Sequence, residues 1–280
     1  MTHPLPTAPA APAAPTLGGR PRTPARSIAI RGATAVLGGI VLLSGTGGVI
    51  GYFMQHDSTR TMVFSEPVTQ VRVQADTGQV RISAGARGQG STVTSRAVSA
   101  FRTAEHHESV QDGVLQVSTG CRGSLALMGD SCSVDFDIVV PPGTAVNVTT
   151  STGDVNVSGT GEAVNVRSDT GDVHVDKSGG LVRLASNTGD LSAEELTGER
   201  VSATTDTGDI ELEFDAAPNQ VEATSETGDL HVVVPRDGTL YQVQADSSLE
   251  EPQLDLPRSS ASSRVISLRT DSGTIEAETD

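Results

Sequence analysis

Short stretches of alternating apolar and polar residues recur from residue 71 to the end of the chain, in pairs that meet at a glycine. Counted from that glycine, apolar residues stand seven and five positions before it and two and four positions after it. A period of two places alternate side chains on one face of a β-strand. The pattern therefore predicts pairs of short strands that each bury one face and are joined by a tight turn.

This pattern fits seven times without a change of spacing. The copies occupy residues 71–82, 146–157, 164–175, 182–193, 201–212, 221–232 and 266–277. A degenerate eighth copy at 241–252 keeps Tyr241 and Val243 but has Ser248 in place of the glycine. In the central five copies, the glycines follow one another at intervals of 18, 18, 19 and 20 residues. Two strands per unit at such a period predict an all-β fold, a parallel β-solenoid whose coils stack about 4.8 Å apart.

The turn glycines are predicted to be structural, because glycine readily adopts the positive φ that tight turns require. They are Gly78, Gly153, Gly171, Gly189, Gly208, Gly228 and Gly273. The first and last clear copies differ from the central five, since Gln79 and Thr274 stand where the others have Asp. Atypical terminal repeats are usual in repeat arrays, so 71–82 and 266–277 are expected to be the end coils.

The segment before the repeats predicts membrane attachment. Residues 32–54 carry no charge over 23 positions, enough for a helix across a bilayer core of about 30 Å. Residues 1–31 hold four arginines, no acid and seven of the fourteen prolines. The positive-inside rule places this proline-rich tail in the cytoplasm. A cleaved signal peptide is the alternative, although no A-x-A-like site follows.

The expected organisation thus has four parts. A disordered cytoplasmic tail (1–31) precedes a transmembrane helix (32–54), a stalk (55–65) and an extracytoplasmic β-solenoid (66–280). Composition agrees with this plan, because only 2% of residues are aromatic and the core must be aliphatic. The net charge is −16, and it becomes −20 without the four arginines of the tail. Such an acidic domain excludes nucleic acid as a partner.

Cys121 and Cys132 are the two cysteines of the chain and lie on the expected outer side. In an oxidising compartment, a pair eleven residues apart is expected to form a disulfide. Closing so short a loop contributes about 3 kcal/mol in the chain-entropy model.

The basic tail, single span, "DTGDV"-type repeats and Val-Pro turns such as "VVPPGTAVNV" resemble the bacterial DUF4097 family. The resemblance covers about residues 66–280. It implies an all-β, solenoid-like envelope protein of a family whose members are named as candidate adhesins. No binding residue is carried over from it.

A Thr-Gly-Asp triplet occupies the turn of the central copies, and stacking would align its carboxylates in one column. The column contains Asp154, Asp172, Asp190, Asp209 and Asp229, and a broken second column contains Asp169, Asp206 and Glu226. Carboxylates about 5 Å apart repel by somewhat under 1 kcal/mol in water. Bound Ca²⁺ would remove that repulsion, which makes the first column a candidate metal site. The interpretation we favour is structural: Thr and Asp hydrogen-bond to the turn backbone, and no cofactor is expected.

Catalytic motifs are missing from the sequence, which holds no G-x-S-x-G, H-E-x-x-H, phosphate loop or dinucleotide fingerprint. His106 and His107 are neighbours on an expected strand and would face opposite sides. His174 and His231 occupy outward positions. We therefore expect a non-catalytic, membrane-anchored module for adhesion or envelope interaction, with an unknown surface partner. The alternatives are a Ca²⁺-dependent binding module that uses the aspartate column, and an enzyme acting on cell-wall polysaccharide.

Overall fold

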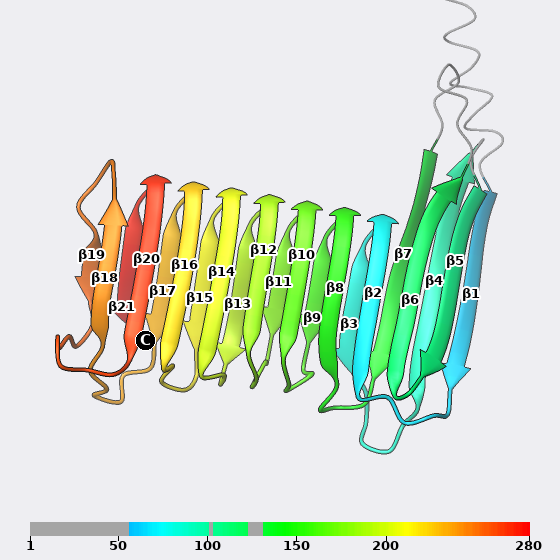
Figure 1. Cartoon of the computed structure of the whole chain (residues 1–280), viewed down its shortest axis with the longest axis horizontal. Helices are drawn as coiled ribbons and strands as arrows, with labels where there is room; N and C mark the ends of the chain where they lie inside the picture. The colour runs from blue at the N-terminus through cyan, green and yellow to red at the C-terminus, as the bar shows by residue number, and fades with distance from the viewer. Residues whose placement is uncertain (1–55, 101–102, 123–130) are drawn as a thin grey trace, which may run out of the picture. The chain divides into compact units, whose positions relative to one another are not determined.

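Two β-sheets face each other across an aliphatic core (Figure 1). The computed structural model describes residues 56–280 except 101–102 and 123–130. The expected tail (1–31) and transmembrane helix (32–54) lie outside these residues. Within the described ranges, no helix combines the length and hydropathy that crossing a bilayer requires.

The first sheet has eleven strands and the second has ten. In spatial order, the first contains β1 (His56–Phe64), β4 (Ser91–Ala100), β7 (Ser131–Val140), β3 (Val80–Ala84), β9 (Val155–Ser158), β11 (Val173–Asp176), β13 (Leu191–Leu196), β15 (Ile210–Phe214), β17 (Leu230–Val234), β21 (Ile275–Thr279) and β19 (Gln253–Asp255). The second contains β18 (Gln242–Ser247), β20 (Val265–Ser272), β16 (Gln220–Thr227), β14 (Arg200–Thr207), β12 (Val182–Thr188), β10 (Val164–Thr170), β8 (Ala145–Thr152), β2 (Gln70–Thr77), β6 (Val114–Arg122) and β5 (Thr103–Gln111).

Each repeat forms one coil, with one strand in each sheet. All four apolar positions are buried in all seven copies, which confirms the core predicted from the pattern. The register aligns equivalent positions of neighbouring coils, so that Val164 lies between Val146 and Val182. The continuous aliphatic core follows from this register, because each inward side chain packs against the aliphatic side chain at the equivalent position of the next coil.

The end coils differ from the prediction. At one end, β6 and β7 pair with the outer edges of β2 and β3, so the first repeat has a neighbour on both sides. At the other end, β20 and β21 lie between β16 and β17 on one side and β18 and β19 on the other. The degenerate copy that begins at Tyr241 is therefore the outermost coil, and the repeat 266–277 is inside it. The prediction failed because it assumed that coils stack in sequence order.

The stalk expected at residues 55–65 is not observed, because most of it belongs to a sheet. Within 55–65, residues His56–Phe64 form β1 and pair antiparallel with β4 along the whole strand. β4 in turn pairs antiparallel with β7, and β5 with β6. The insertion after the first repeat contains β4, which pairs with β7 on one side. Its other edge pairs with β1. The sheets are therefore largely parallel, with antiparallel strands at this end.

Candidate functional site: the Thr-Gly-Asp edge of the stack

The Thr-Gly-Asp turns lie in one row along one edge of the stack, where the strands of the second sheet end and those of the first begin (Figure 1). Parallel, in-register pairing creates this row, because each coil repeats the turn of the previous one. The row brings together all five aspartates of the predicted column, and each of them is exposed.

The turn glycines are required by geometry on two grounds. Gly171 and Gly189 have φ of +133° and +142°, a region that side chains disfavour. A Cβ atom added to Gly171 would also overlap the backbone carbonyl of Gly153 in the preceding coil. Gly78, Gly153, Gly208 and Gly228 share the positive φ, and Gly273 shares the close approach without it. Any side chain at these positions would separate adjacent coils.

The aspartate column forms a ladder of hydrogen bonds between coils. The backbone N–H of Asp190 donates to Oδ1 of Asp172 at 3.0 Å, and the same contact links each neighbouring pair. The distances are 3.2 Å for Asp172 to Asp154 and 2.8 Å for both Asp209 to Asp190 and Asp229 to Asp209. Thr274 N–H continues the ladder to Asp229 at 2.7 Å. One oxygen of each carboxylate is thus engaged with protein backbone.

This ladder extends beyond the five aspartates that the sequence singled out. Gln79, which replaces Asp in the first repeat, donates its N–H to Oδ1 of Asp135 on β7 at 2.9 Å. Asp135 therefore supplies to the first repeat the contact that the preceding coil supplies elsewhere. Among the residues that the structure describes, no group of three or more His, Cys, Asp or Glu side chains could hold a metal ion.

A column of buried hydroxyls was missed by the apolar pattern. It lies three positions before each turn glycine except Gly78, where Ala75 takes the place, and contains Thr150, Ser168, Ser186, Thr205, Ser225 and Thr270. Ser225 Oγ donates to the carbonyl of Gly208 at 3.0 Å, and Thr270 Oγ1 donates to that of Gly228 at 2.9 Å. The signal was present as a small hydroxyl residue at a constant position, but a template of apolar residues ignores it.

The second acidic column remains exposed, and its members do not pair with the turn backbone in the contacts that the structure shows. Asn187 on β12 lies between Asp169 on β10 and Asp206 on β14. This position follows from the register, which pairs the residues on either side of each of them. Hydrogen bonds within the edge therefore come from the first column and from the hydroxyls of Thr205, Ser225 and Thr270. The buried hydroxyls of Thr150, Ser168 and Ser186 have no partner among the described residues. These hydrogen bonds indicate that the Thr-Gly-Asp turns stabilise the contact between adjacent coils.

His174 and His231 lie on different coils of the first sheet, and each contacts polar residues of neighbouring strands. His174 Nδ1 lies 3.3 Å from Ser192 Oγ. His231 Nε2 lies 3.4 Å from an oxygen of Glu278, and its Nδ1 lies 3.9 Å from an oxygen of Glu211. These contacts join neighbouring coils across the outer face of the first sheet, as the aspartates do along the edge.

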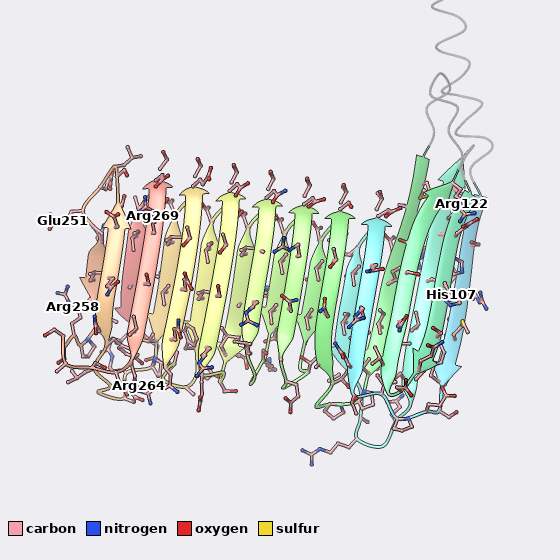
Figure 2. The ribbon with its side chains drawn as sticks, viewed as in Figure 1. His107, Arg122, Glu251, Arg258, Arg264 and Arg269 are labelled. Atoms are coloured by element: carbon pink, nitrogen blue, oxygen red, sulfur yellow. A yellow bond between two sulfur atoms is a disulfide. The ribbon has the colours of Figure 1, made fainter. Side chains whose placement is uncertain are left out.

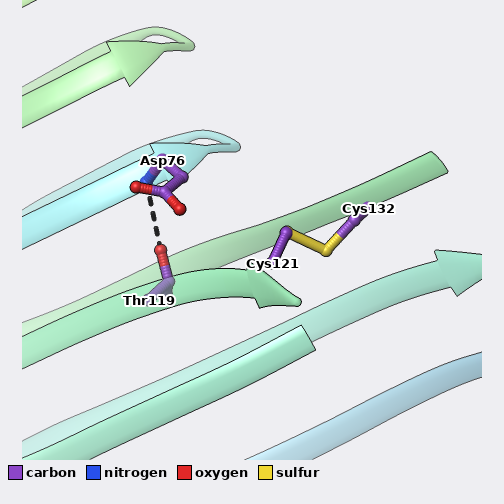
Figure 3. Close-up of a disulfide and its surroundings, with 4 residues drawn as sticks. All are labelled: Asp76, Thr119, Cys121 and Cys132. Atoms are coloured by element: carbon purple, nitrogen blue, oxygen red, sulfur yellow. Dashed lines mark hydrogen bonds between the residues drawn. A yellow bond between two sulfur atoms is a disulfide. The ribbon is translucent and has the colours of Figure 1, made fainter. Parts of the chain in front are cut away.

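The disulfide between Cys121 and Cys132 is present, as predicted (Figure 3). It joins β6 in one sheet to β7 in the other, with 6.2 Å between the Cα atoms. Next to it, Thr119 Oγ1 accepts a hydrogen bond of 3.2 Å from the backbone N–H of Asp76 on β2. The crosslink joins the two sheets at the edge where the Thr-Gly-Asp turns join them in the regular coils.

The fold and this edge define a class: an all-β protein with two largely parallel sheets, whose repeated polar residues join one coil to the next. A family model described as Toastrack DUF4097 matches residues 65–278. The chain belongs to the DUF4097 family.

Solved structures with a distant likeness come from several bacteria. A candidate adhesin from Bacteroides fragilis NCTC 9343 is 13% identical, with 79% of this chain and 97% of that chain covered and a TM-score of 0.39. A candidate adhesin from Parabacteroides merdae ATCC 43184 is 10% identical, with 80% and 96% covered and a TM-score of 0.37. A candidate cell adhesion protein from Clostridium sporogenes ATCC 15579 is 11% identical, with 80% and 100% covered and a TM-score of 0.35. Comparison with curated proteins finds no match. Likenesses of this size carry no argument about function.

Proposed function

We propose that the protein is a non-catalytic interaction module of the cell envelope. In this proposal, residues 32–54 anchor it in the membrane, residues 1–31 lie in the cytoplasm and the β-stack is displayed outside the cell. Its role is to present a rigid, acidic surface to an envelope or cell-surface partner.

One observation carries the non-catalytic part of this proposal. The most repeated polar chemistry of the chain, the aspartate column, is engaged in backbone hydrogen bonds between coils over 2.7–3.2 Å. A general acid or base needs a proton-transferring group aimed at a substrate. In the column, the carboxylates instead accept N–H groups of their own protein, which suits a scaffold.

The disulfide supports the extracytoplasmic placement. It links two strands in opposite sheets, and disulfides of this structural kind persist mainly in oxidising compartments. The arginines before the uncharged segment and the acidic remainder after it agree with this orientation.

A topology experiment tests the placement. Intact cells that produce the full chain with an N-terminal tag are treated with a protease that does not cross the membrane. We expect the acidic part to be digested while a tagged fragment of the tail and span survives. Survival of the acidic part in intact cells, together with its digestion after lysis, would contradict the proposal.

A binding experiment tests the role. Purified full-length protein in detergent is mixed with isolated envelope fragments and sedimented. We expect saturable co-sedimentation that exceeds that of an unrelated protein of similar negative charge. Equal sedimentation of the two proteins would remove the support for an envelope interaction.

A further inference from the structure

A cavity of about 600 Å³ lies at the N-terminal end of the stack, and residues of both sheets line it. Arg60 comes from β1 in the first sheet. Glu105, His106 and His107 come from β5 in the second sheet, and Ser118 and Arg122 come from β6. In Figure 2, His107 and Arg122 mark this end of the stack. The site exists because β1 and β5 are the outermost strands of their sheets here.

The polar groups of this cavity are not all engaged. Arg122 Nε forms an ion pair of 3.0 Å with Glu105 Oε2, which leaves that pair neutral. The Arg60 guanidinium has no hydrogen bond or ion pair to any residue in the described ranges, and its side chain is exposed. His106 Nδ1 is buried and has no partner within the same ranges. A fixed positive charge that no described residue neutralises therefore borders the cavity, and the ring of His106, whose Nδ1 is shielded from solvent, lies beside it.

This composition contrasts with the rest of the protein. The chain has a net charge of −16, and its turn edge is a row of carboxylates. Of the two glutamates on β5, Glu105 is held by Arg122, while Glu108 is buried and does not line the cavity. The cavity thus favours an anionic group at a place where an acidic protein would otherwise repel one.

We propose that this cavity binds a sugar unit that carries a carboxylate or a phosphate. Arg60 presents the planar donor fork that matches either oxyanion, and such charge-assisted pairs are the stronger hydrogen bonds. The Thr119 hydroxyl, which lies on the same face of the second sheet as His106, supplies a further hydrogen-bonding group for an oxyanion or a sugar hydroxyl. The volume lies within the range of small-molecule sites, about 300 to 1,000 Å³, and exceeds what a lone inorganic anion fills. This assignment rests on the proposed envelope role and names the ligand class for it.

The test is isothermal titration of the full-length protein in detergent with glucuronic acid and glucose 6-phosphate. Glucose and inorganic phosphate are titrated in parallel, because they separate the sugar from the anion. We expect saturable binding of the two acidic sugars, and binding of glucose and of phosphate weaker by about tenfold or more. Arg60→Gln should weaken the acidic sugars by about tenfold or more. Arg167→Gln is the matched control, because Arg167 is an exposed arginine on β10 far along the stack.

Melting curves of both variants must match the wild type, so that loss of binding is not loss of folding. Absence of saturable binding of either acidic sugar would overturn the assignment, as would equal affinity for phosphate alone. Unchanged affinity in Arg60→Gln would place the binding elsewhere and would also overturn it. If the protein still co-sediments with envelopes in any of these cases, the sugar assignment fails while the proposed function stands.

Discussion

The middle of the stack and its two ends treat strand edges differently, because inner strands are paired on both sides while β1, β19, β18 and β5 each keep one unpaired edge. In the middle, each coil provides the edge for the next, and the glycine and aspartate columns repeat the same contacts from coil to coil. At the ends, the chain departs from sequence order. Segments that come before or after the outermost coils, β2 with β3 and β20 with β21, lie inside them.

The comparison shows how a repeat array is terminated. Unpaired strand edges invite association with other chains. The outermost C-terminal strand β19 has three residues and is preceded by Glu250, Glu251 and Pro252, features that discourage edge pairing. The N-terminal end instead has the nine-residue strands β1 and β5, a disulfide and a polar cavity. The outermost strand of the first sheet is therefore short and flanked by acidic residues at one end and nine residues long at the other.

The largest effect is expected in the middle, from Gly171→Ala. The new Cβ would overlap the Gly153 carbonyl and would stand at a φ of +133°. Strain and backbone displacement together should lower the free energy of unfolding by about 4 kcal/mol. Urea unfolding measures this value. Gly161→Ala is the control, since Gly161 also has a positive φ but an added Cβ meets nothing within 4 Å. Equal losses in both variants would show that coil contact is unimportant at Gly171.

At the N-terminal end, reduction of the disulfide should have the next largest effect. The Cys121→Ser, Cys132→Ser double variant loses a crosslink between the sheets, and the chain-entropy model gives about 3 kcal/mol for a loop of this length. Unfolding of the variant and of the wild type is compared with and without a reducing agent. The reductant should destabilise only the wild type. Identical unfolding curves for oxidised wild type and variant would show that this end does not limit stability.

At the C-terminal end, stability should depend on pH through Tyr241. Burial raises the pKa of Tyr241 to about 12, and its hydroxyl has no partner among the described residues. Since an unfolded tyrosine has a pKa of about 10, the folded form retains a proton that the unfolded form loses above that pH. The stabilisation is therefore complete below about pH 10 and is lost as the pH rises toward 12.

Urea unfolding at pH 9 and pH 11 compares the wild type with Tyr241→Phe, which cannot ionise. The wild type should lose about 1 kcal/mol more than the variant between these pH values. The same loss in both proteins would show that the outermost coil does not bury this phenol in solution.

The smallest effect is expected from Asp172→Asn in the middle of the ladder. Asparagine keeps an oxygen for the N–H of Asp190 and removes one repelling charge, so the change should stay within about 0.5 kcal/mol. Asp172→Ala removes the acceptor and should cost about 1 kcal/mol. Melting curves with and without Ca²⁺ test the alternative role. A calcium-dependent rise in the wild-type melting temperature that Asp172→Asn abolishes would make the column a metal site.

The sequence by itself determined the regular part of the protein. Strand faces and turn glycines follow from local periodicity and local backbone preference, so every repeated apolar position from Val71 to Ala277 could be assigned to the core. The pairing of Cys121 with Cys132 was equally accessible, since the chain offers no other cysteine. The place of the aspartates at the turns could be read from the spacing, but not the atom to which each one bonds.

Only the tertiary structure decided the order of the coils at the ends, the incorporation of β1 and the ladder from Asp to the next N–H. These features depend on contacts between segments far apart in the sequence, such as Gln79 with Asp135. Local patterns do not encode them, because the alternation of one strand fixes which face it buries but not which of several compatible strand edges it pairs with. The cavity at Arg60 and His106 belongs to the same group, since β1 and β5, which line it, are the outermost strands of two different sheets.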